Sequence, residues 1–248
     1  IGEKGQVTYT FRVKSQGGHA SAPPPHTPVG VLAQAVTRVE NNPFPFTMSR
    51  AASALFDTLG RHSTFAYRLI FANLWCFRPV LNLLCKKAGG EMNALVRTTC
   101  AFTQMQGSDA ANVMPPVATV GANLRIITGE TKASVKERLA KTIANPDIEI
   151  IEQDGNDPSP DSRTDGEAWQ RLSKAIGQTW PDAIISPYLM VAASDSRHYA
   201  AISEHVFRFC PMELSAEERR LIHGNDERIP LAKLHETIRF YIRVMRAS

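Results

Sequence analysis

Apolar and polar residues alternate close to the start of the chain, with the period of a β-strand. Over residues 7–14 every second side chain is apolar, which is typical of a strand with one buried face and one solvent face. These apolar residues are Val7, Tyr9, Phe11 and Val13. A Gly- and Pro-rich stretch follows, and residues 29–40 then place apolar side chains at helical spacing after Thr27 and Pro28, which suit a cap and a first turn. The sequence therefore predicts strand, irregular loop and helix.

Periodic apolar patterns of this kind continue to about residue 151. Residues 95–105 are rich in β-forming types, and residues 117–127 alternate again with Ala118, Val120 and Leu124 on one face. Residues 132–143 carry one apolar helical stripe, and residues 148–151 form a short apolar run. The order β, α, β, β, α, β predicts an α+β fold, a ferredoxin-like sandwich.

Residues 44–90 differ in composition from the rest of this predicted sandwich and interrupt it after the first helix. The stretch is dense in aromatic, Leu and Ile residues and ends at Gly89 and Gly90, so we expect a helical insertion. One interpretation is a helical hairpin that packs its aromatic rings on the sheet. The other is that aromatic residues, Phe71 and Trp75 among them, form an apolar wall for a long acyl chain or contact a membrane.

A second unit is predicted after residues 153–166, which are dense in acidic and turn-forming residues. It is expected to contain a helix around Trp169, a strand over 184–191, a short helix after Ser194, a strand over 206–209 and a long final helix. Helices that alternate with short apolar strands indicate an α/β layer. Two or three strands make a thin sheet, so this unit looks incomplete.

Composition narrows the function classes. With 248 residues and 43% hydrophobic residues the chain can bury a core, which excludes intrinsic disorder. A net charge of +4 is too small to indicate a nucleic-acid partner. The most apolar run, residues 69–77, is far shorter than the roughly 20 residues of a membrane span, so no transmembrane helix is expected. The four cysteines have no metal-ligand spacing, and we interpret them as buried free thiols.

Four polar clusters at predicted loops or element ends are candidates for chemistry. They are GGHAS at 17–21 before a proline run, NVMPP at 112–116, SDSRHY at 194–199 and IHGNDERI at 222–229. Together with GEKG at 2–5, NALVRTT at 93–99 and RFCP at 208–211, they resemble, in the same order, the co-catalytic zinc peptidases and aminoacylases. The resemblance is strongest to the branch of carboxypeptidase S and the N-acyl amino acid hydrolases.

This resemblance implies a domain arrangement. Residues 1–155 correspond to the lid, or dimerisation, domain with its insertion at about 44–90, and residues 156–248 to the C-terminal part of the catalytic domain. It also implies a homodimer through the lid, two zinc ions in the complete enzyme, and a small N-acyl amino acid or peptide as substrate. The family's upstream half, which supplies most metal ligands and the general base, has no counterpart in this sequence. The abrupt start of the chain at Ile1 suggests that this sequence is a piece of a longer protein. We expect this piece to be inactive alone.

Site residues follow from the resemblance. His19 matches a lid histidine that stabilises the oxyanion of the partner's tetrahedral intermediate, and Asn112 matches a lid amide that assists it. Arg125 and Arg197 match arginines that bind the substrate carboxylate, for which a planar guanidinium is suited. His223 matches a metal ligand, whose ring Asp226 or Glu227 could orient. His198 lies in a matching motif but has no assigned role.

Each of these residues also has a plainer interpretation. His19 and Asn112 suit ordinary turns, the arginines suit surface ion pairs, and a lone His223 suits a loop beside a helix cap. Glu217 and Glu218 lie in a charged helical stretch and are interpreted as solvated surface. At the level of function, a zinc-dependent amide hydrolase is preferred, a non-catalytic dimerisation module is the alternative, and a nucleic-acid binder lacks the paired aromatic residues it would need.

Overall fold

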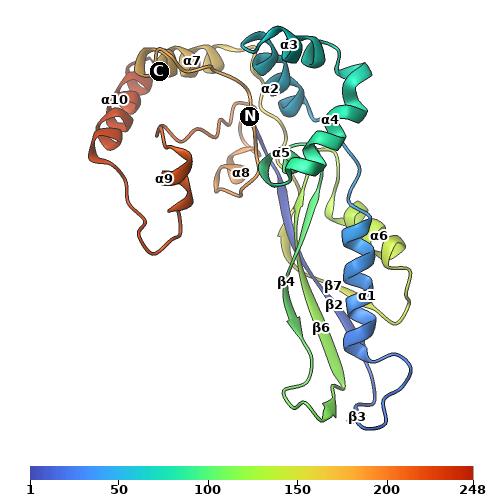
Figure 1. The fold of residues 1–248 in the computed structure, drawn as a ribbon. Coiled ribbons are helices and arrows are strands. Elements are labelled where there is room, and N and C mark those ends of the chain that lie inside the picture. Colours follow the sequence, from blue (N-terminus) through green and yellow to red (C-terminus); the bar gives the residue numbers. More distant parts are fainter. Residues whose placement is uncertain (248) are drawn as a thin grey trace.

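A four-stranded antiparallel sheet forms the centre of the computed structural model, which describes residues 1–247 (Figure 1). Its strands are β2 (Gly5–Lys14), β4 (Thr99–Gln106), β6 (Val117–Ile126) and β7 (Glu149–Asn156), in the order β4-β6-β2-β7. Helices α1 (Pro28–Asn41) and α6 (Lys132–Ile143) cover one face. The connectivity and strand order are those of a ferredoxin-like sandwich, and the predicted fold class is confirmed.

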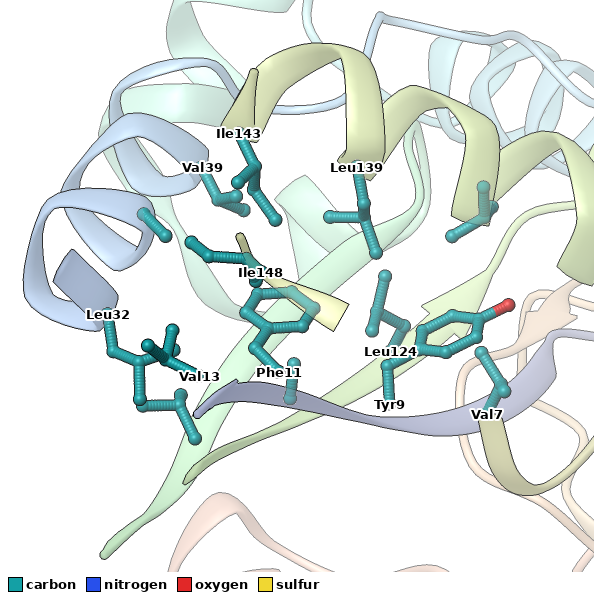
Figure 2. Close-up of a cluster of buried hydrophobic side chains, with 14 of the residues drawn as sticks. Val7, Tyr9, Phe11, Val13, Leu32, Val39, Leu124, Leu139, Ile143 and Ile148 are labelled. Carbon is teal, nitrogen blue, oxygen red and sulfur yellow. The ribbon is translucent and has the colours of Figure 1, made fainter. Parts of the chain in front are cut away.

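The core of the sandwich follows directly from the alternation in β2. Tyr9 and Phe11 are fully buried between the sheet and the two helices, where they meet Leu32 and Leu139 (Figure 2). The Tyr9 hydroxyl, at the edge of this cluster, donates a hydrogen bond of 2.8 Å to the Lys132 carbonyl at the start of α6. The opposite face of the sheet carries polar side chains, as the alternating pattern requires, and no helix within residues 1–247 covers it.

Both helices begin with side-chain caps. The Thr27 hydroxyl accepts from the Gly30 amide at 3.2 Å and Pro28 opens the first turn of α1, as predicted. Thr131 and Ser134 form a reciprocal capping box at the start of α6. These caps fix where each helix starts.

The insertion is helical, with α2 (Arg50–Arg61), α3 (Phe65–Ala72), α4 (Leu74–Ala88) and α5 (Gly90–Ala94). Phe44, before the first of these helices, is buried in the sandwich core, but the rings that the helices bury do not pack on the sheet. Phe56 and Phe71 stack at 5.5 Å in a second cluster, which also holds Ile1, Leu189 and Trp169 from outside the insertion. The hairpin-on-sheet interpretation is therefore wrong, because the insertion packs at the end of the sheet where the chain enters and leaves the sandwich.

The second unit is mostly helical and loop, with α7 (Glu167–Thr179), α8 (Ser196–Tyr199), α9 (Ala216–Arg220) and α10 (Leu231–Ala247). Its predicted strand over 184–191 is reduced to β8 (Leu189–Met190), which pairs in parallel with β1 (Gly2–Glu3). The predicted strand over 206–209 is absent from the described chain. Val206 instead exchanges hydrogen bonds with the Ser162 hydroxyl, so its backbone is satisfied without a neighbouring strand.

Residues 153–156, which were expected to belong to a boundary loop, continue β7. The four cysteines are free, as predicted, but the expectation that all are buried is wrong, because Cys76 and Cys210 are exposed. Within residues 1–247 no single helix combines the length and apolar composition of a membrane span. Helices α3 and α4 reach that length and composition only as a pair, and the pair is bent by 110°.

Candidate functional site

His19 and Asn112 lie together at the far tip of the sandwich. Strand β3 (Gly18–His19) pairs with strand β5 (Val113–Met114), and His19 lies opposite Val113. The Ala20 amide donates to the Asn112 carbonyl at 2.9 Å. Gly17 and Gly18 have φ values of 68° and 133°, which L side chains rarely adopt, so these glycines permit the turn that presents His19. The structure thus brings together two of the residues that the sequence motifs singled out.

The His19 ring is exposed and held from one side. Its Nδ1 lies 2.8 Å from the Ser21 hydroxyl and accepts from the Ser21 amide at 3.1 Å. Because Nδ1 accepts from the amide, the neutral ring carries its proton on Nε2. No protein group in the described chain bonds Nε2, so this N–H points outward as a free donor.

Arg125 lies at the other end of the sheet. It projects from the open polar face of β6 between the buried Leu124 and Ile126, and its Nη1 donates to the Gln6 side chain at 2.6 Å. Strand β6 runs from Val117, near the tip, to Arg125 over eight residue steps. At about 3.4 Å per residue, the Arg125 backbone is about 27 Å from the tip that carries His19.

Arg197 belongs to the same end of the molecule as Arg125. It lies in the short helix α8, and its Nη1 donates to the Ser194 carbonyl at 3.0 Å. Ser194 is bonded in turn to Glu3, two residues before β2 begins, and Gln6 of β2 contacts Arg125. Four of the candidate residues therefore form two groups, one at the tip and one at the chain entry, and a single chain does not bring the groups together (Figure 1).

Glu3 organises the entry group and was not identified from the sequence. It is 1% exposed, and its carboxylate accepts from the Ser194 amide at 2.8 Å, the Ser194 and Ser196 hydroxyls at 2.8 and 3.1 Å, and Arg208 Nε at 3.1 Å. Burial alone would raise the pKa of this carboxyl, but the hydrogen bonds outweigh burial and hold the pKa below its usual value. The signal was present in the GEKG and RFCP motifs, which supply Glu3 and Arg208.

Lys4 points in the opposite direction from Glu3, into the junction with the insertion. It is 1% exposed, and its Nζ donates to the carbonyls of Ala94 and Arg97 at 3.0 and 2.8 Å. Burial, with a smaller contribution from the positive charge of Arg125, lowers the pKa of Lys4 to about 7. Glu3 and Lys4 thus fasten the loop of Arg197 and the insertion to the same short segment at the start of the chain.

His223 is exposed in the loop between α9 and α10, with a left-handed φ of 63°. In the described chain it has no hydrogen bond to Asp226 or Glu227, so the expected orienting contact is not made. No group of three or more His, Cys, Asp or Glu residues within residues 1–247 is arranged to hold a metal ion. A zinc site needs three or four protein ligands, so the donors in this chain do not fit a complete site.

Glu218 has a structural role, and Glu217 lies beside it in the first turn of α9. The Glu218 carboxylate accepts from the Ser215 amide at 2.7 Å and completes a capping box at the start of α9. This contact supports their interpretation as part of a surface helix.

Comparison with known proteins defines the class. Residues 1–150 match the model of the M20 peptidase dimerisation domain, and the chain belongs to this family. The chain is 35% identical over 99% of its length to a probable carboxypeptidase S-like protein of Dictyostelium discoideum, and 32% identical over its whole length to an N-fatty-acyl-amino acid synthase/hydrolase of Danio rerio. It spans 47% and 48% of those two proteins, about half of each.

Solved structures show the same fold. An M20 family metallo-carboxypeptidase from Sulfolobus solfataricus aligns with all of this chain and 63% of its own, with a TM-score of 0.61 at 12% identity. The family predicted from the sequence motifs is confirmed, and so is the mixed helix-and-sheet lid fold.

Proposed function

We propose that the intact protein is a zinc-dependent amide hydrolase that cleaves N-acyl amino acids or the C-terminal residues of small peptides. Membership of the M20 peptidase dimerisation family and the hydrolase names of the relatives support this proposal. The observation that carries it is the division of the site residues into a tip group with a free imidazole donor and an entry group with two arginines. Residues 1–155 would serve as the lid and residues 156–248 as part of the catalytic domain.

The tip group would act on a partner subunit. His19 is about 27 Å of strand from the entry group of its own chain, so in a homodimer joined through the lids it would reach the partner's site. There the outward Nε2–H would donate to the oxygen that gains charge as water attacks the amide carbonyl, and Asn112 would assist. Such a donor is worth roughly 3 to 4 kcal/mol in comparable sites.

The entry group would bind the substrate carboxylate. Arg125 and Arg197 each spend one N–H on a neutral protein oxygen, from Gln6 and Ser194, and neither forms a salt bridge in the described chain. Their remaining N–H groups can grip a carboxylate in two places, which fixes the scissile amide relative to the catalytic groups. This specificity fits substrates that end in a free carboxylate.

The metal would be held mainly by residues outside this chain. When bound, zinc would supply an activated water, and His223 would contribute one imidazole ligand to one of two ions. Because no cluster of three or more His, Cys, Asp or Glu residues that could hold a metal ion is found within residues 1–247, we expect residues 1–248 alone to bind no zinc tightly and to be inactive.

The experiment has two parts. The intact protein and the 248-residue chain are dialysed, their zinc content is measured, and hydrolysis of N-acyl amino acids is assayed. We expect zinc and turnover only in the intact protein, and a His19→Ala change there should lower kcat by about 10²- to 10³-fold with unchanged zinc content. Zinc-free and inactive intact protein would favour the non-catalytic dimerisation module instead, and unchanged turnover in His19→Ala would contradict the assignment of His19.

A further inference from the structure

The outward side of the insertion is an apolar surface that nothing in the described chain covers. Helix α3 has no buried residue, and Phe65 on α3 and Trp75 on α4 are 80% and 83% exposed. Other large apolar side chains on these two helices are also exposed: Tyr67, Leu69, Val80, Leu83 and Leu84. Contiguous exposed apolar surface of this kind marks an interaction site.

Helix α4 shows that this exposure is organised. Its inner side buries Leu81 and Cys85, one turn apart, in the second cluster. Trp75 and Leu83, two turns apart, lie on the outer side with Val80 and Leu84. A surface helix normally turns polar side chains outward, whereas α4 is apolar on its outer side as well. The two helices meet at 110°, and α4 lies on the side of the molecule away from α7 and α10 (Figure 1).

Positive charge accompanies this surface. Residues 44–90 contain six Lys and Arg residues and one acidic residue, so the insertion carries more net positive charge than the +4 of the whole chain. The acidic residue, Asp57, is paired with Arg61 at 2.9 Å. Lys86 and Lys87 are exposed in the last turn of α4, on the same outer side as Trp75 and Leu83. None of the described salt bridges neutralises Lys86 or Lys87.

We propose that α3 and α4 dock this protein onto an anionic lipid surface. Exposed Phe, Trp and Leu beside Lys and Arg are the composition of helices that lie in a lipid interface, with rings at the headgroup level and cations on anionic lipids. A second copy of the chain is a poorer occupant, because it would bring two basic surfaces together. This proposal is independent of the hydrolase activity.

The test is co-sedimentation of the intact protein with vesicles of phosphatidylcholine containing about one-third phosphatidylserine. We expect binding that falls at high salt and is weak on pure phosphatidylcholine. Phe65→Ser with Trp75→Ser should reduce binding at least about tenfold, and Lys86→Glu with Lys87→Glu should reduce it similarly. The matched control is Ile202→Ser, which removes an 81% exposed apolar side chain outside the insertion and should leave binding unchanged.

Three results would overturn the proposal. The first is equal binding by the wild type and the Phe65/Trp75 double variant, and the second is equal binding to neutral and anionic vesicles. The third is a wild type that does not bind vesicles while the double variant changes oligomeric state in sedimentation velocity, which would assign this surface to contact with a second protein chain. Thermal unfolding of each variant checks that its fold is intact, as expected for substitutions at exposed positions.

Discussion

The sandwich and the second unit are held together in different ways. In the sandwich, four paired strands and two capped helices bury a continuous apolar cluster. In the second unit, the sheet is a single two-residue pairing, and the loop of Arg197 is fixed by side-chain hydrogen bonds to Glu3. Arg125 is therefore positioned by a regular sheet, whereas Arg197 is positioned by a few buried polar groups. We expect the position of Arg197 to be the more sensitive to single substitutions.

The largest effect is expected for Glu3→Ala. Arg208 is 3% exposed in its side chain, and the substitution leaves its charge buried without its partner, at a cost of about 3–5 kcal/mol. Hydrogen exchange should rise in residues 189–209 and remain low in β2 and β6. Glu149→Ala, which removes the half-exposed partner of Arg12, is the control and should cost less than about 1 kcal/mol. An equal rise in hydrogen exchange in residues 189–209 and in β2 and β6 would show that the second unit and the sandwich do not unfold independently.

Leu139→Ala should affect the sandwich instead. Leu139 is 1% exposed in the cluster between sheet and helices, and its truncation is expected to cost about 2–5 kcal/mol. Hydrogen exchange should accelerate in β2, β6 and α6. Lys136→Ala, on the exposed side of the same helix, should leave exchange almost unchanged. Faster hydrogen exchange in Leu139→Ala that is confined to residues 189–209 would contradict the idea that the sandwich and the second unit are stabilised separately.

Acid should release the second unit before the sandwich. The folded-state pKa of Glu3 lies below its usual value, so the stabilisation from this carboxylate is present above about pH 4.3 and is lost as pH falls through the folded pKa. Protonation leaves the side chain in place, so the loss should be smaller than in Glu3→Ala. Hydrogen exchange between about pH 6 and pH 3 measures it. In Glu3→Gln this pH dependence of residues 189–209 should disappear, and its persistence would assign the effect to another group.

The smallest effect is expected at a helix cap. Thr27→Ala removes the acceptor of the Gly30 amide at the start of α1 and should cost about 1 kcal/mol. Chemical denaturation of the intact protein measures the loss, and Thr27→Ser should restore most of it. Equal stability of Thr27→Ala and the wild type would show that tertiary packing alone fixes the start of α1.

The same contrast explains what could be predicted from the sequence. The alternation of Val7, Tyr9, Phe11 and Val13 and the stripe of α6 predicted the sandwich, because each element there buries one periodic face. The strand expected over 206–209 was wrong, because Val206 bonds a Ser162 side chain 44 residues away. Periodicity carries no information about such contacts, since they depend on residues far apart in the sequence.

The residues of the candidate site also differ in how far the sequence could predict them. The motifs located His19 and Asn112, which the structure brings to one tip, and Arg125 on the polar face of β6. They did not indicate that Glu3 and Arg208 organise the loop of Arg197, because that role depends on burial of both groups. The assigned roles of His19, Asn112, Arg125, Arg197 and His223 stay predictions.

The central claim is that the tip of one subunit completes the catalytic site of another, in which we propose that the entry group binds the substrate and His223 binds a metal ion. Subunits of the intact protein that carry His19→Ala are therefore mixed with subunits that carry His223→Ala, after each variant alone has been shown to be inactive. Random pairing makes half of the dimers mixed, and each mixed dimer holds one site with both residues intact, so about a quarter of the wild-type activity should return. Activity that stays at the level of the separate variants, in a sample shown to contain mixed dimers, would contradict the claim.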